Sequence, residues 1–112
     1  MHMGAMAVIG ANNPENMVHI IINNEAVGGM PTTANQIDIA AIAKACGYPY
    51  SVCVNTVELL EKELLLAKKR NTLSLIEVKC AVGARDNLGR PTTTALENKQ
   101  NFMDYLINNN SL

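Results

Sequence analysis

Three short apolar runs, separated from one another by helical patterns, constrain the fold of this 112-residue chain more than any other feature. The runs cover residues 17–22, 50–54 and 73–80 and are rich in β-branched side chains. The apolar, β-branched character of the first run, residues 17–22, is typical of a strand that is buried on both faces of a parallel sheet. Because strands and helices alternate along the chain, the order predicts a single α/β domain with a parallel sheet and flanking helices.

Helical patterns fill the segments around these runs. The first covers residues 1–11, has no N-cap residue before it and stops ahead of Pro14. The second covers residues 38–46, where Asp38 is placed to cap the first turn. Gly47 follows this helix and is predicted to adopt the left-handed conformation that ends many helices. The apolar residues of the second helix fall on one face, which predicts that the helix packs against the sheet.

A third helical pattern extends to Arg70, and an amphipathic tail follows the last strand. Asn55 and Glu58 have the spacing of a capping box at the start of the third helix. The basic residues of its last turn suit the negative end of the helix macrodipole. Its inner stripe is predicted to contain Val57, Leu60, Leu64 and Ala67. The tail is predicted to be helical over residues 97–107 and to dock through Phe102, Tyr105 and Leu106.

Composition narrows the class of protein. The chain has 9 basic and 10 acidic residues, and without a basic stripe nothing favours nucleic acid or an anionic membrane as partner. Its three cysteines form no C-x-x-C pair, which favours reduced thiols over a disulfide framework or a zinc site. No apolar run reaches the roughly 18 residues that span a bilayer. These features predict a soluble, cytoplasmic protein.

The segment after the first apolar run is the most informative about function. It reads Asn23-Asn24-Glu25-Ala26-Val27-Gly28-Gly29. In open α/β sheets, ligands bind beyond the carboxyl ends of the strands. An asparagine amide oxygen and a backbone carbonyl suit Mg²⁺, and glycines let the backbone approach a diphosphate. Asn-Asn after a strand is also common in ordinary turns, so the residues alone leave open both a turn and a metal- or anion-binding loop.

The sequence also resembles a known family. Residues 1–47 are similar to the cofactor-binding domain of thiamin-diphosphate-dependent enzymes, whose signature begins with Gly-Asp-Gly and ends in Asn-Asn. The stretch VHIIINNEA, residues 18–26, matches the closing half of that signature. Residues 75–103, from LIEVKC to NKQNFM, resemble the C-terminal segment of phosphonopyruvate decarboxylases and of the related sulfopyruvate decarboxylases.

This resemblance implies that residues 1–112 are the C-terminal part of a thiamin-diphosphate-binding domain of the PP type, without its first strand and its Gly-Asp-Gly motif. It implies that the Asn24 side-chain oxygen and the Ala26 carbonyl coordinate Mg²⁺, which bridges to the cofactor diphosphate. Val27, Gly28 and Gly29 would lie beside the cofactor. No catalytic residue is implied in this chain, because the activating glutamate of the family comes from another domain.

The activity implied for the complete protein is conversion of 3-phosphonopyruvate to phosphonoacetaldehyde and CO₂, with this chain inactive alone. Decarboxylation of sulfopyruvate is the alternative, and a truncated, non-catalytic α/β module that assembles with a partner chain is a third hypothesis. The implied partners are a small 2-oxo acid substrate, the remainder of the enzyme or another subunit, and further copies in a homo-oligomer.

Four further residues carry weaker hypotheses. His19 lies in the middle of a predicted strand and is interpreted as a hydrogen-bonded core histidine. His2 either packs in the first helix or approaches the cofactor. Arg85 and Arg90 lie in a predicted loop, either as surface or interface residues or as ligands of a substrate phosphonate, since guanidinium groups bind such oxyanions well.

Overall fold

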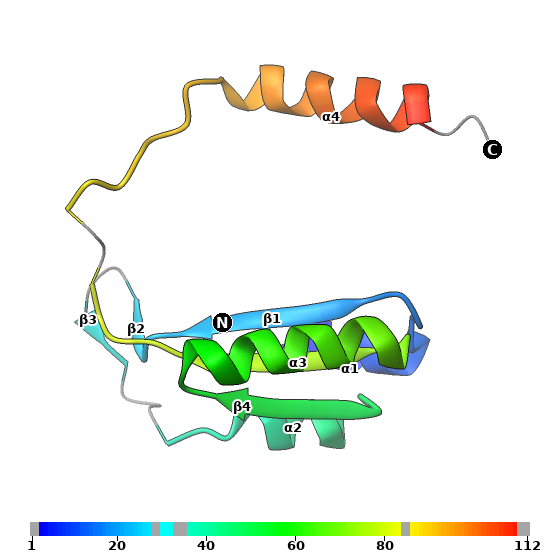
Figure 1. The fold of residues 1–112 in the computed structure, drawn as a ribbon, viewed down its shortest axis with the longest axis vertical. Helices are drawn as coiled ribbons and strands as arrows, with labels where there is room; N and C mark the ends of the chain where they lie inside the picture. The colour runs from blue at the N-terminus through cyan, green and yellow to red at the C-terminus, as the bar shows by residue number, and fades with distance from the viewer. Residues whose placement is uncertain (1–2, 28–29, 33–35, 84–85, 110–112) are drawn as a thin grey trace.

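A three-stranded parallel sheet, in the order β1-β5-β4, forms the centre of the computed structural model (Figure 1). Its strands are β1 (Val18–Asn23), β4 (Tyr50–Val54) and β5 (Ser74–Lys79). The structure describes residues 3–27, 30–32, 36–83 and 86–109. Both strand pairs run parallel, so the predicted α/β fold with a parallel sheet and flanking helices is confirmed.

Helices cover both faces of the central strand β5. Helices α1 (Gly4–Asn12) and α2 (Ile39–Ala45) form one apolar cluster with Leu73 and Leu75. Helix α3 (Val57–Arg70) packs on the opposite face, where Ala67 meets Ile76 and Val78. Successive side chains of a strand point to opposite faces, so Leu75 and Ile76 belong to different clusters. The two clusters therefore bury β5 almost completely.

The two ends of α2 agree with their sequence signals. Asp38 caps the helix by accepting a hydrogen bond from the Ala41 N–H at 2.8 Å. At the other end, the Tyr48 N–H donates to the Ala43 carbonyl at 3.1 Å, while Gly47 has a φ of +96°. This is a Schellman ending, in which the residue after the cap adopts positive φ, and glycine does so without steric cost.

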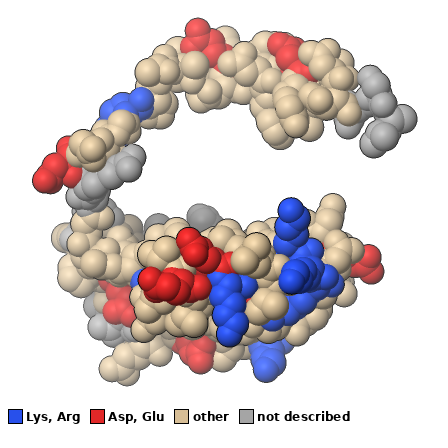
Figure 2. All heavy atoms as spheres, in the orientation of Figure 1, with Lys and Arg blue, Asp and Glu red and all other residues tan. Residues whose placement is uncertain are grey.

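The N-cap of helix α3 lies one residue later than predicted. The prediction placed the cap at Asn55, but Thr56 has the extended backbone of a cap, and its side chain accepts from the Leu59 N–H at 3.2 Å. Because the helix starts at Val57, Asn55 lies too far back to serve it. Figure 2 shows acidic groups gathered over the first half of this helix and basic groups over its last turn, as the helix macrodipole favours.

Strand β1 differs from the prediction that it is buried on both faces. Its side chains alternate in exposure, and Val18, Ile20 and Ile22 are 40%, 44% and 66% exposed. The physical reason is position: β1 is at the edge of the sheet, and α3 packs over β4 and β5. The inner stripe of α3 is likewise incomplete, because Ala67 is buried whereas Val57 and Leu64 are exposed.

A small antiparallel hairpin follows β1, where the sequence predicted a turn or a binding loop and no strands. It pairs β2 (Ala26–Val27) with β3 (Met30–Pro31). The Glu25 carbonyl closes the hairpin by accepting from the Thr32 N–H at 2.7 Å and from the Thr32 hydroxyl at 3.1 Å. The hairpin places the residues after β1 beside the end of the sheet.

The tail forms helix α4 (Ala95–Asn109), which is longer than the predicted 97–107. The prediction that it docks on the domain is wrong, since Phe102 and Tyr105 are each 63% exposed and Leu106 is 42% exposed. Figure 1 shows α4 apart from the sheet, at the end of an extended connection. In the part of the chain that the structure describes, no helix is long and apolar enough to cross a bilayer.

Candidate functional site

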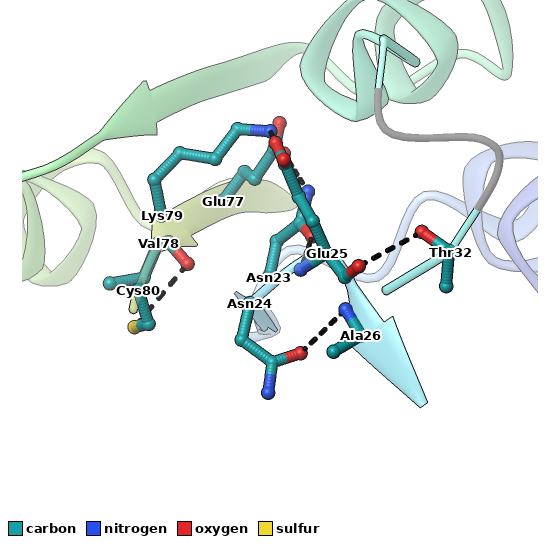
Figure 3. A network of polar contacts seen from close by, with 9 residues as sticks. All are labelled: Asn23, Asn24, Glu25, Ala26, Thr32, Glu77, Val78, Lys79 and Cys80. Carbon is teal, nitrogen blue, oxygen red and sulfur yellow. Dashed lines mark hydrogen bonds and ion pairs between the residues drawn. The ribbon is translucent and has the colours of Figure 1, made fainter. Parts of the chain in front are cut away.

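The carboxyl ends of β1 and β5 meet at one edge of the sheet. Asn23 pairs in register with Lys79, and the Cys80 N–H donates to the Asn23 carbonyl at 2.9 Å. The loop that follows β1 therefore lies against the last residues of β5, although more than fifty positions separate them in sequence (Figure 3). This is the edge at which ligands bind in open α/β sheets, as the sequence predicted.

Two successive asparagine turns shape the loop. The Asn23 side-chain oxygen accepts from the Glu25 N–H at 3.0 Å, and the Asn24 side-chain oxygen accepts from the Ala26 N–H at 3.1 Å. The turn interpretation of Asn-Asn is therefore confirmed. An amide oxygen has two lone pairs, so a turn of this kind leaves Asn24 one acceptor position for a further ligand.

The hairpin directs the Ala26 carbonyl. Paired residues of an antiparallel ladder alternate between hydrogen-bonded and non-hydrogen-bonded pairs. Glu25 and Thr32 form a hydrogen-bonded pair, so Ala26 and Pro31 form the other kind. The Ala26 N–H and carbonyl consequently point away from β3, on the side where the Asn24 oxygen accepts the N–H. Two uncharged oxygens thus face the same side of the loop.

A buried carboxylate on β5 contacts the loop. Glu77 is 1% exposed and accepts from the Asn23 side-chain amide at 2.6 Å. The Lys79 ammonium lies 3.3 Å from the Glu77 carboxylate and donates to the Glu25 carboxylate at 2.9 Å. Sequence reasoning missed these partners. The available signal was Glu77 itself, the single acidic residue of its strand, which lies between the apolar residues Ile76 and Val78.

Local charges shift two pKa values at this edge. The hydrogen bond to Glu25 raises the pKa of Lys79, and Glu77 adds to the effect. Desolvation of the sulfur raises the pKa of the Cys53 thiol, although the residue as a whole is exposed, and the negative charge of Glu77 adds to this shift. Lys79 is therefore a firmly charged group, whereas Cys53 is kept as a neutral thiol and is a poor nucleophile.

A cavity of roughly 610 Å³ lies between the loop and helix α1. Its volume is in the range of sites that hold small molecules or cofactors. Asn24, Ala26 and Val27 line it, together with His19 of β1 and apolar residues of α1. The His19 ring nitrogen Nδ1 lies 3.0 Å from the hydroxyl of Tyr48, which is 2% exposed, so the predicted hydrogen bond is confirmed. His19 itself is half-buried and lines the cavity, so the prediction that it lies in the core is wrong.

The structure brings three of the five predicted cofactor-binding residues together on this cavity. Gly28 and Gly29 lie outside the described residues, as do His2 and Arg85. Arg90 is described and exposed, and it lines neither this cavity nor the smaller one beside Cys53 and Glu77. Within the described ranges, no three His, Cys, Asp or Glu side chains gather as a metal cluster.

Comparisons with known proteins point to one group of enzymes. No family model matches the chain. A phosphonopyruvate decarboxylase of Streptomyces viridochromogenes is 30% identical over 95% of the chain, and one of Streptomyces hygroscopicus is 30% identical over 94%. The sulfopyruvate decarboxylase subunit beta of Methanocaldococcus jannaschii is 33% identical over 73% of the chain.

The chain spans only part of these relatives. It covers 28% and 27% of the two phosphonopyruvate decarboxylases and 42% of the sulfopyruvate decarboxylase subunit. Its sheet and helices are consistent with part of a thiamin-diphosphate-binding domain. Over nearly all of its own length, the chain is therefore homologous to one part of the thiamin-diphosphate-dependent phosphonopyruvate decarboxylases.

Proposed function

We propose that the chain forms part of a Mg²⁺ and thiamin diphosphate site in a decarboxylase of 2-oxo acids. The observation that supports this most directly is that the Asn24 side-chain oxygen, which accepts from the Ala26 N–H, and the Ala26 carbonyl lie on the same side of the loop after β1. Both residues line a cavity of roughly 610 Å³. The homology to phosphonopyruvate decarboxylases supplies the class of reaction.

The donor set fits a hard cation. Mg²⁺ prefers oxygen ligands and retains phosphate and water oxygens in its coordination sphere. Asn24 and Ala26 would provide two uncharged oxygens, and the diphosphate, water and protein groups from outside this loop would provide the others. Val27, Gly28 and Gly29 are proposed to lie beside the cofactor. When bound, thiamin diphosphate supplies the electron sink that makes loss of CO₂ from a 2-oxo acid possible.

We propose 3-phosphonopyruvate as the substrate of the whole protein and phosphonoacetaldehyde as the product. The names of two relatives support this choice, and sulfopyruvate is the alternative because of the third. The two acids differ in their anionic head group, so turnover of each by the whole protein separates the two hypotheses. No catalytic residue is assigned to this chain.

The name of the third relative, a subunit beta, supports a partner chain as part of the active assembly. The exposed apolar side chains of the edge strand β1 support the same proposal, because an uncovered strand edge favours pairing with another chain. A non-catalytic module that only assembles with such a partner is the alternative. It would bind a partner chain without strengthening cofactor binding.

The test replaces Asn24 with leucine, which has a similar volume and no oxygen. Affinity for thiamin diphosphate is measured by calorimetry with and without Mg²⁺, on the chain and on the assembly that it forms with its partners. We expect Asn24→Leu to weaken the Mg²⁺-dependent affinity at least tenfold. Asn101→Leu, at an exposed position of α4, is the matched control. Equal affinity in both variants would refute the assignment of Asn24.

A further inference from the structure

We infer that Glu77 and Lys79 are positioning residues that hold the loop after β1 in the shape that aligns the Asn24 and Ala26 oxygens. The inference rests on the proposed function for its consequence in cofactor binding. Its structural part, that these two side chains set the conformation of the loop, can be tested without any cofactor. The contacts form two chains of interaction, one through Asn23 and one through Glu25 (Figure 3).

The first chain of interaction orients Asn23. A buried carboxylate requires hydrogen-bond partners, and bonds to a charged group are the stronger kind. Glu77 is 1% exposed, and the Asn23 amide nitrogen donates to it at 2.6 Å. An amide group has one nitrogen and one oxygen, so fixing the nitrogen on Glu77 turns the oxygen away from it. That oxygen accepts from the Glu25 N–H at 3.0 Å, which is the first turn of the loop.

The second chain of interaction holds Glu25 in an uncommon backbone conformation. Its φ is +54°, in the left-handed region that residues other than glycine rarely adopt. The Lys79 ammonium binds its carboxylate at 2.9 Å, so Glu25 is held through both its side chain and its N–H. Lys79 also lies 3.3 Å from Glu77 and thereby separates two carboxylates that would otherwise repel each other.

Glu25 stands between the two proposed metal ligands, so its conformation decides their arrangement. Its left-handed φ turns the chain such that the Ala26 N–H reaches the Asn24 oxygen at 3.1 Å. Its carbonyl also closes the hairpin through Thr32. If Glu25 relaxed to an extended conformation, the turn would open and the oxygens of Asn24 and Ala26 would separate. Lys79 therefore acts on the site through Glu25, without being a ligand itself.

The experiment measures amide hydrogen exchange by NMR in the 112-residue chain without cofactor. We expect Lys79→Met to speed exchange of the Ala26 and Thr32 amides at least tenfold. Lys79→Arg retains the cation and should restore slow exchange. Lys62→Met removes the same charge from an exposed position of α3 and should change nothing at the loop. The amide of Ile76 in β5 should exchange at the wild-type rate in all variants, which separates a loop effect from general destabilisation.

A second variant keeps the test decisive if Lys79→Met does not fold. Glu25→Gln removes the charge at the more exposed end of the ion pair and leaves the buried Glu77 in place. It is expected to speed exchange of the same two amides. Unchanged exchange of the Ala26 and Thr32 amides in the folded variants would overturn the inference.

Calorimetry with thiamin diphosphate and Mg²⁺ on the same proteins distinguishes the two proposals. Faster loop exchange together with at least tenfold weaker Mg²⁺-dependent affinity supports both. Faster loop exchange, with no Mg²⁺-dependent affinity in the wild-type chain or its assembly, supports the structural role of Lys79 and contradicts the proposed function. If the wild type binds the cofactor but the loop amides of the variants exchange at the wild-type rate, the role of Lys79 is wrong. The proposed function then stands.

Discussion

Gly10 lies where helix α1 meets the C-terminal end of α2, and the packing there leaves no room for a side chain. A Cβ atom added at Gly10 would lie 1.8 Å from the Cys46 carbonyl oxygen and 2.8 Å from its carbon. This carbonyl belongs to the cap residue of α2, in the turn that the Tyr48 and Gly47 hydrogen bonds fix. The two helices can therefore approach this closely only because residue 10 is glycine.

Replacing Gly10 with alanine is expected to destabilise the protein, because the backbone of one helix must move. Overpacking of this kind costs about 1–3 kcal/mol, which outweighs the gain of roughly 0.5–1 kcal/mol for alanine over glycine in a helix. Gly4→Ala is the matched control, since a Cβ at Gly4 meets nothing within 4 Å. Urea unfolding should show a lower midpoint for Gly10→Ala alone. Equal midpoints for the two variants would contradict the packing argument.

At the scale of the element, α4 depends on its own local interactions. The Thr94 N–H and hydroxyl donate to the Glu97 carboxylate at 2.7 and 2.8 Å, and the Glu97 N–H donates back to the hydroxyl at 3.2 Å. This reciprocal capping box stabilises the first turn. Because α4 has no buried residue, packing on the sheet does not contribute to its stability. Isolated helices of this length are marginal in water.

Thr94→Ala is therefore expected to unfold much of α4 without weakening the sheet. Loss of a threonine cap costs a helix about 1 kcal/mol, and far-UV circular dichroism should report lower helicity while the urea midpoint stays unchanged. Thr92→Ala, which lies outside the capping box, is the control. Equal helicity in both variants would show that the capping box does not sustain α4.

The pH dependence of α4 gives a second readout of the same capping box. The hydrogen bonds from Thr94 lower the pKa of Glu97 from its ordinary value of 4.5. A carboxylate with a lowered pKa stabilises the folded form above the ordinary value, and this stabilisation is lost as the pH falls below it. Helicity of the wild-type chain should therefore decrease below about pH 4.5, and Glu97→Gln should reduce this change.

Local signals predicted some elements well and others poorly, for physical reasons. The ends of α2 were predictable because Asp38 and Gly47 act within one turn of the helix. The start of α3 was placed one residue early because Asn55 and Thr56 are both good caps, and the spacing to Glu58 favoured the first. An amphipathic pattern indicates that α4 has an apolar stripe, but not whether another element covers it.

At the candidate site, too, features set by neighbouring residues were predictable, whereas contacts between residues far apart in the sequence were not. The loop after β1 was predictable because parallel strands end at one edge of a sheet, and asparagine favours turns there. Glu77 and Lys79 were not, since their loop partners Asn23 and Glu25 are each 54 residues away in sequence. Nor does an apolar run reveal whether its strand lies at the centre or the edge, which is why the exposure of Ile20 was missed.

At the scale of the whole molecule, one face of β1 remains uncovered. Val18, Ile20 and Ile22 are all at least 40% exposed on a strand that lies at the edge of the sheet. Exposed apolar side chains next to an unpaired strand edge are a template for association with another chain. Among the described residues, no helix covers the face of β1 that carries these three side chains, and α4 lies apart from it (Figure 1). We therefore expect the isolated chain to associate with itself.

The double variant Val18→Thr, Ile20→Thr tests whether this face drives the association. Threonine keeps the β-branched shape that suits a strand while making the face polar. Sedimentation velocity over a range of concentrations should show an association at least tenfold weaker than in the wild type, equivalent to about 1.4 kcal/mol. Leu65→Gln, which removes a 64% exposed apolar residue from α3, should leave the association unchanged.

A wild-type chain that sediments as a monomer at every concentration would show that the β1 face is stable in water without a partner. Equal weakening by Leu65→Gln would instead assign the association to exposed apolar surface in general rather than to this strand.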